Sequence, residues 1–110
     1  MPFEKERQFY RMQIPPGDVA VFRVGSLRMP ILEISERGFR YAPAPGHEPE
    51  VGSAISGIAA FKTIGEHEVT GNLSRRQGKS FVAVLDPPGI PYATIMALQL
   101  FLRKRYPGRA

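Results

Sequence analysis

The sequence predicts an all-β domain, an antiparallel barrel or sandwich, that is followed by one C-terminal helix. Short runs of β-branched and apolar residues recur between turns at intervals of roughly 8–12 residues, which is typical of such sheets. The 110 residues include 11 glycines and 11 prolines, which suits a chain with many turns. The six predicted strands are Val19–Val24, Met29–Ser35, Phe39–Tyr41, Ile55–Lys62, Glu66–Arg75 and Ser80–Leu85.

Turn residues separate these six runs. Gly25 and Ser26 form a hairpin-like break after the first run, and Gly38 turns the chain between the second and the third. The proline-rich stretch 43–50 predicts a surface loop, and residues 76–79 predict the turn before the last strand. Between the turns, apolar and polar residues alternate, as they do in a strand with one buried face.

The last part of the chain predicts a helix over Tyr92–Arg105. Pro91 suits the first turn of a helix, and most residues that follow it are strong helix formers. The basic residues 103–105 complement the helix dipole. Because this helix is apolar nearly all round, it has either one broad packing face or two faces, one for the sheet and one for a second subunit. A homodimer through the helix is one of these two arrangements.

Length, charge and composition limit the class of protein. A chain of 110 residues fits one domain, and a net charge of +5 favours anionic partners. There is no cysteine, which excludes disulfides and thiol chemistry and suits a reducing compartment. The longest apolar stretches, Val51–Phe61 and Ile90–Leu102, are shorter than the ~18 residues of a membrane span. Residues 1–11 lack the apolar core of a secretory signal. We therefore expect a cytoplasmic protein with no membrane insertion.

No pattern of catalytic residues is present. The two histidines, His47 and His67, lie in a predicted loop and a predicted strand, and no acidic cluster has metal-ligand spacing. The sequence contains neither a glycine-rich phosphate loop nor a nucleophile elbow. We therefore expect no enzymatic activity, no metal and no cofactor.

Two polar clusters carry the candidate binding chemistry. The first is Arg7-x-x-x-Arg11, which lies in a polar segment that we expect to form a flexible arm over residues 1–13. The second, "EISERG" (33–38), has the pattern Glu-x-Ser-x-x-Gly and lies at the end of a strand and in its turn. Each cluster alone is common in a basic protein, so their combination and order carry the information.

An Arg-x-x-x-Arg arm that is followed by such a strand end resembles the PilZ family of cyclic di-GMP receptors. The family pattern is Arg-x-x-x-Arg, then Asp/Asn-x-Ser-x-x-Gly. The first element matches at Arg7 and Arg11. The second element matches at Ser35 and Gly38, with Glu33 where the family favours Asp or Asn. The predicted strands and the terminal helix extend this resemblance over nearly the whole chain.

The resemblance implies a six-stranded antiparallel PilZ-type β-barrel over residues 14–110, with a C-terminal α-helix. It also implies a cyclic di-GMP-binding receptor that relays its signal to an unidentified protein partner through ordering of the N-terminal arm. In the family such partners belong to bacterial motility, pilus or exopolysaccharide machinery. The implied ligand-binding residues are Arg7, Arg11, Glu33, Ser35 and Gly38.

The chemistry of these residues suits that ligand. Arginine binds phosphate oxygens, or the O6 and N7 edge of guanine, with two N–H groups at once. Ser35 offers a hydroxyl, Glu33 offers an acceptor for guanine N–H groups, and Gly38 allows close approach of the backbone. Four further arginines are weaker candidates for phosphate contacts, because solvated surface charge is the commoner role of such residues: Arg37, Arg40, Arg75 and Arg76.

Two other functions compete with the receptor. A PilZ-fold adaptor that binds protein but no nucleotide is favoured by Glu33 and opposed by the intact arginine pair. A small barrel for single-stranded nucleic acid is allowed by the basic charge. Such proteins spread aromatic residues over one sheet face, whereas here the aromatic residues are scattered and tryptophan is absent. We therefore expect no nucleic-acid partner.

Overall fold

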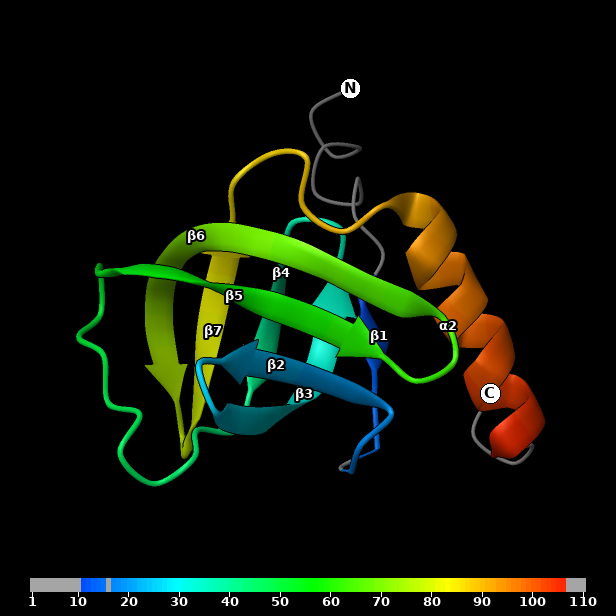
Figure 1. Cartoon of the computed structure of the whole chain (residues 1–110), viewed down its shortest axis with the longest axis horizontal. Coiled ribbons are helices and arrows are strands. Elements are labelled where there is room, and N and C mark those ends of the chain that lie inside the picture. Colours follow the sequence, from blue (N-terminus) through cyan, green and yellow to red (C-terminus); the bar gives the residue numbers. More distant parts are fainter. Residues whose placement is uncertain (1–10, 16, 107–110) are drawn as a thin grey trace.

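A closed barrel of six antiparallel strands forms the body of the protein, with one helix after the last strand (Figure 1). This computed structural model describes residues 11–15 and 17–106, so Arg7 and most of the predicted arm lie outside the described residues. All six predicted strands and the helix are confirmed. The elements are β1 Met12–Gln13, β2 Ala20–Val24, β3 Leu27–Ser35, β4 Gly38–Tyr41, β5 Ala54–Phe61, β6 Gly65–Gln77, β7 Ser80–Leu85 and α2 Tyr92–Arg105.

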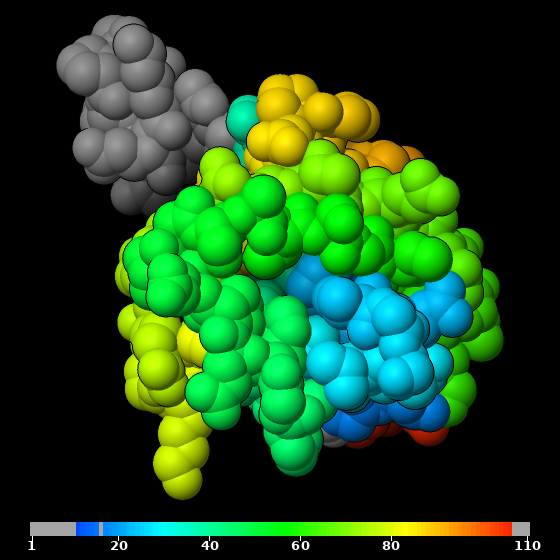
Figure 2. Space-filling model, turned by 60° about the vertical axis from the view of Figure 1, so that its left-hand side comes forward, coloured from blue at the N-terminus to red at the C-terminus, as the bar shows by residue number. Residues whose placement is uncertain are grey.

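Two three-stranded meanders build the barrel. Strands β2, β3 and β4 form the first meander, and β5, β6 and β7 form the second. Pairing of β2 with β5 joins them along one side, and pairing of β4 with β7 joins them along the other. The ring therefore closes without a free edge among these six strands. The loop over residues 42–53 connects the meanders and lies on the outer face beside the β2–β3 hairpin (Figure 2).

A seventh, very short strand precedes the barrel. Met12 and Gln13 of β1 pair with Ile34 and Glu33 of β3, and the Met12 side chain is buried in the core. The sequence predicts both residues in the arm, because two residues are too few to show an alternating pattern. The sheet therefore starts at residue 12 rather than at the expected residue 14. As a result, Arg11 stands directly before a strand that is fixed to β3.

The core fills the barrel through alternation along each strand. In β6, buried Val69, Gly71 and Leu73 alternate with exposed neighbours, as the sequence predicts. Aromatic rings meet at the centre of the barrel. The ring centroids of Phe22 and Tyr41 lie 5.0 Å apart in an edge-to-face arrangement, which is a favoured geometry for aromatic pairs.

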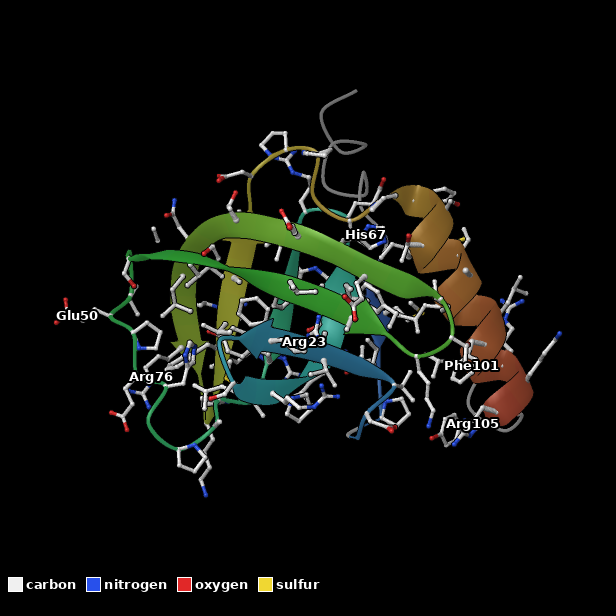
Figure 3. All side chains as sticks on the ribbon, in the orientation of Figure 1. Arg23, Glu50, His67, Arg76, Phe101 and Arg105 are labelled. Carbon is white, nitrogen blue, oxygen red and sulfur yellow. The ribbon has the colours of Figure 1, made fainter. Side chains whose placement is uncertain are left out.

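Helix α2 packs against the barrel through a single stripe. Its buried residues are Thr94, Ile95, Leu98 and Leu102, whose spacing of three to four positions places them on one face. His67 of β6 faces this helix (Figure 3), and its Nε2 lies 2.9 Å from the Thr94 hydroxyl. On the outer side of the helix, Leu100 is exposed. In the described part of the chain, no helix has the length and apolar character that a membrane span needs.

Candidate functional site

A surface pocket of about 260 Å³ lies on the outer wall of the barrel. Residues of β3, β4, β6 and β7 form it, together with Arg11 beside β1 and Arg37 in the turn between β3 and β4. The pocket therefore spans the line where β4 and β7 join the two meanders. Its lining residues are Arg11, Glu33, Ile34, Ser35, Arg37, Gly38, Phe39, Arg40, Ser74, Arg75, Gln77, Val82, Ala83 and Val84.

Four of the five site residues expected from the sequence line this one pocket. Arg11, Glu33, Ser35 and Gly38 are all among the lining residues. The fifth, Arg7, lies outside the described residues. Strand pairing explains the grouping, because the β1–β3 register sets Met12 opposite Ile34 and so places the preceding residue, Arg11, near the end of β3.

Strand register arranges the pocket residues in rows across the barrel wall. Glu33 of β3 is the partner of Arg40 in β4, and Arg40 is the partner of Val82 in β7. Val82 is in turn the partner of Arg75 in β6. Partnered residues on neighbouring strands share a face. Along the outer wall this row therefore begins with charged side chains on β3 and β4, continues with an apolar one on β7 and ends with a charged one on β6.

Glu33 is held by an ion pair within the protein. Arg40 Nε donates to Glu33 Oε1 at 3.5 Å, and Arg40 Nη1 donates to the Ser80 hydroxyl at 3.3 Å. The side chains of Glu33 and Arg40 are each 21% exposed, so both are shielded from bulk water. The pair offsets the negative charge of the carboxylate inside a pocket whose other charged lining residues are all arginines.

The Ser35–Gly38 turn brings two strands close together. The Ser35 hydroxyl donates to the Gly38 carbonyl oxygen at 3.4 Å and so closes the turn. A Cβ atom on Gly38 would collide with the backbone carbonyl of Ala83 in β7. Gly38 is therefore needed so that β4 can approach β7. The sequence predicts a different role for this glycine, namely close approach of the backbone to a ligand.

The four further arginines divide into two groups. Arg37, Arg40 and Arg75 line the pocket, whereas Arg76 is absent from its lining. The Arg76 guanidinium instead lies 5.2 Å from the centre of the Phe81 ring. The register across β4, β7 and β6 decides this division, and a single sequence does not reveal that register.

Seven further lining residues carry no binding signal in the sequence. Three of them belong to the core, namely Ile34, Phe39 and Ala83. The other four are not buried: Ser74, Gln77, Val82 and Val84. Among them, Val84 is 49% exposed although it lies in the middle of a sheet. An exposed valine in β7 was a signal in principle, because β7 alternates buried and outward positions.

The histidines lie outside the pocket lining. His47 Nε2 is 2.7 Å from the Tyr41 hydroxyl and fixes the 42–53 loop to the barrel. Burial lowers the pKa of His47 and raises the pKa of Tyr41 to about 12. Across residues 11–15 and 17–106, no group of three or more acidic or histidine side chains is arranged to hold a metal ion.

Comparison with known proteins gives similarity in structure only. No family model and no curated protein matches the chain. The crystal structure of the uncharacterized Legionella protein Lpg0364 is similar with a TM-score of 0.58 and 14% identity, over 92% of this chain and 99% of that chain. The Bacillus subtilis inhibitor of motility, MotI/DgrA, is similar with a TM-score of 0.52 and 17% identity, over 94% of this chain.

At these identities the likeness concerns the fold alone. The match covers 52% of the MotI/DgrA chain, so this chain spans about half of that protein's length. MotI/DgrA has the PilZ fold, and its matched part resembles the closed barrel and helix described above. This chain therefore has a PilZ-like fold.

Proposed function

We propose that this chain is a receptor for cyclic di-GMP and has no catalytic activity. The observation that carries the proposal is the grouping of Arg11 with Glu33, Ser35 and Gly38 in one pocket. These are the described positions at which the sequence resembles the PilZ motifs. The PilZ-like fold supports the proposal at the level of architecture.

The electrostatics of the pocket suit an anionic nucleotide. Arg11, Arg37, Arg40 and Arg75 line it, against the one carboxylate of Glu33. Cyclic di-GMP carries two phosphates and two guanine bases, and arginine recognises both kinds of group. A concave site with several guanidinium groups attracts such a ligand and offers each phosphate a charge-assisted contact.

Glu33 is compatible with this ligand because of its partner. An unpaired carboxylate would repel phosphate, but the ion pair with Arg40 compensates that charge. One carboxylate oxygen of Glu33 accepts the bond from Arg40. The carboxylate has further acceptor capacity for guanine N–H groups. The longer side chain of glutamate thus serves both the strand partner and the ligand.

The signal would be relayed through the N-terminal arm. We propose that Arg7 and Arg11 bind the ligand together and that the arm becomes ordered over it. A protein partner then recognises the ordered arm and barrel. The similarity to MotI/DgrA, which is named as an inhibitor of motility, supports motility machinery as one class of partner, and exopolysaccharide machinery is another.

A nucleotide-free adaptor is the second candidate function. The observation in its favour is that Glu33 and Arg40 already satisfy each other within the protein. A pocket whose polar groups are internally paired is stable without a ligand. In that case the fold would present its surface to a protein partner, and the pocket would stay empty.

Isothermal calorimetry separates the two functions. Wild-type protein is titrated with cyclic di-GMP, with GTP and GMP as control ligands. We expect micromolar or tighter binding that is selective for cyclic di-GMP and lost in Arg11→Ala. Arg103→Ala removes an exposed arginine from α2 and serves as the matched control; it should bind like the wild type. Absence of both heat and a thermal shift with cyclic di-GMP at high concentration would overturn the receptor and leave the adaptor as the favoured function.

A further inference from the structure

The pocket wall carries two outward valines in a place that usually holds polar residues. In β7, Val82 and Val84 alternate with the buried Phe81, Ala83 and Leu85, so they point out of the barrel. Both valines line the pocket, and Val84 is 49% exposed. Apolar side chains that face a concave, otherwise charged pocket provide contact surface for the flat part of a ligand.

Gly38 leaves this apolar surface uncovered. It is the Cα partner of Val84 on the neighbouring strand β4. On the other side of Gly38, Ser35 of β3 is its partner and carries only a short side chain. On its β6 side the partner of Val84 is Asn72. The small residues on its β4 and β3 side therefore leave room above Val84 for a planar ring.

An arginine stands on each side of Val82. Arg40 of β4 and Arg75 of β6 are its two Cα partners. Neighbouring strands are about 4.8 Å apart, so the Cα atoms of the two arginines are on the order of 10 Å apart across the valine. Both side chains are long enough to converge on a group that lies between them.

Both guanidinium groups are oriented by contacts within the wall. Arg40 is held by Glu33 and by Ser80. Arg75 is exposed, and its Nη2 donates to Gln77 Oε1 at 3.1 Å. Orientation before binding lowers the conformational entropy that is lost when a ligand binds.

We propose that Arg40, Arg75, Val82 and Val84 form a nucleotide subsite in which a purine ring packs on the valines and a phosphate lies between the two arginines. This subsite rests on the proposed function and adds Arg75 and Val84 to the residues that determine affinity. The barrel wall then contributes to the binding affinity in addition to the arm and the Glu-x-Ser-x-x-Gly turn.

The chain offers a matched pair of variants to test the subsite. Arg75→Met and Arg76→Met remove the same charge from adjacent exposed positions of β6. Arg75 lines the pocket, whereas Arg76 lies against Phe81 near the end of β6 (Figure 3). In calorimetric titrations with cyclic di-GMP, we expect Arg75→Met to weaken binding about tenfold, as loss of a charged hydrogen bond does. Arg76→Met should stay within about twofold of wild type.

A second variant tests the apolar part of the subsite. Val84→Thr keeps the shape of the side chain and replaces one methyl group by a hydroxyl on an exposed position, so the fold is preserved. We expect it to weaken cyclic di-GMP binding by about three- to tenfold, since it removes apolar contact with the ring. Circular dichroism of each variant verifies that the barrel has formed.

The outcomes separate this subsite from the receptor function. If the wild type binds cyclic di-GMP and Arg75→Met binds equally well, the subsite is wrong while the receptor stands. Equal losses in Arg75→Met and Arg76→Met would also overturn it, because they would indicate an unspecific charge effect. If the wild type does not bind cyclic di-GMP, the receptor proposal fails, and GTP becomes the probe. Binding of GTP that is lost in Arg75→Met then supports the subsite, and absence of GTP binding overturns it.

Discussion

At the scale of single residues, the departure from the family pattern at residue 33 has a structural partner. Glu33 reaches across to Arg40 on the next strand, and Arg40 also contacts Ser80. The sequence predicted the position of Glu33 and its acceptor chemistry. It did not predict the ion pair, because pairing of β3 with β4 shifts register at a bulge between residues 31 and 33.

Removal of Arg40 should expose the cost of an unpaired carboxylate. We expect Arg40→Met to lower the free energy of unfolding by about 1 kcal/mol, since Glu33 remains partly buried without its partner. In the double variant with Glu33→Gln the loss should be smaller than the sum of the two single losses. Urea denaturation of the four proteins measures this coupling. Strictly additive losses would show that the ion pair contributes nothing.

His47 should make stability depend on pH. Burial lowers its pKa in the folded protein, so the unfolded chain binds a proton at a higher pH than the folded chain does. The contribution of His47 to the free energy of unfolding is therefore fully present above the ordinary histidine pKa of about 6.5, and it is lost as the pH falls below that value. Compared with His47→Gln, the wild type should lose more stability between about pH 7 and pH 5 in thermal denaturation. Parallel pH profiles for the two proteins would contradict this assignment.

At the scale of elements, the pairing of β4 with β7 closes the barrel and forms the centre of the pocket. Gly38 permits this pairing because a side chain there would collide with the Ala83 carbonyl. We expect Gly38→Ala to lower the free energy of unfolding by about 1–3 kcal/mol, as overpacking against a backbone does. Ser35→Ala at the same turn loses one weak hydrogen bond and should cost less than about 1 kcal/mol. Denaturant titration compares the two, and equal costs would contradict the role assigned to Gly38.

The helix offers a second comparison at this scale. Leu98 is fully buried against the barrel, whereas Leu100, two positions later, is 57% exposed. We expect Leu98→Ala to lower the free energy of unfolding by about 2–5 kcal/mol. The same change at residue 100 should stay within about 0.5 kcal/mol. A large loss from Leu100→Ala in concentrated protein, and none in dilute protein, would instead indicate that its outer face packs against a second copy.

Elements with a strong local pattern were predictable, and their pairing was not. Helix Tyr92–Arg105 has the bounds that its residues predict, and β6 follows its alternation. β1 was missed because its two residues owe their conformation to pairing with β3 rather than to their own pattern. The motif residues could be grouped from the sequence because they form one recognisable pattern. The place of Arg75 beside Val82 could not be predicted, because it depends on the register of β6 on β7.

At the scale of the whole molecule, the pocket depends on closure of the barrel. The first meander contributes β3 and β4 to the pocket, and the second contributes β6 and β7. These strands come together only where β4 pairs with β7. An open or unfolded chain therefore lacks the pocket, and a ligand that binds there must favour the closed barrel over every open state.

Ligand binding and global stability should therefore be linked quantitatively. At a cyclic di-GMP concentration about 100 times the Kd, the free energy of unfolding should rise by about 2.7 kcal/mol, because only the folded state binds. Denaturant unfolding with and without ligand measures the rise, and Arg11→Ala, which we expect not to bind, should show none. Saturable binding in calorimetry without any gain in stability would mean that the ligand also binds the open chain. A site shared between the two meanders does not allow that result. Such an outcome would therefore show that the ligand binds elsewhere than at the β4–β7 pairing.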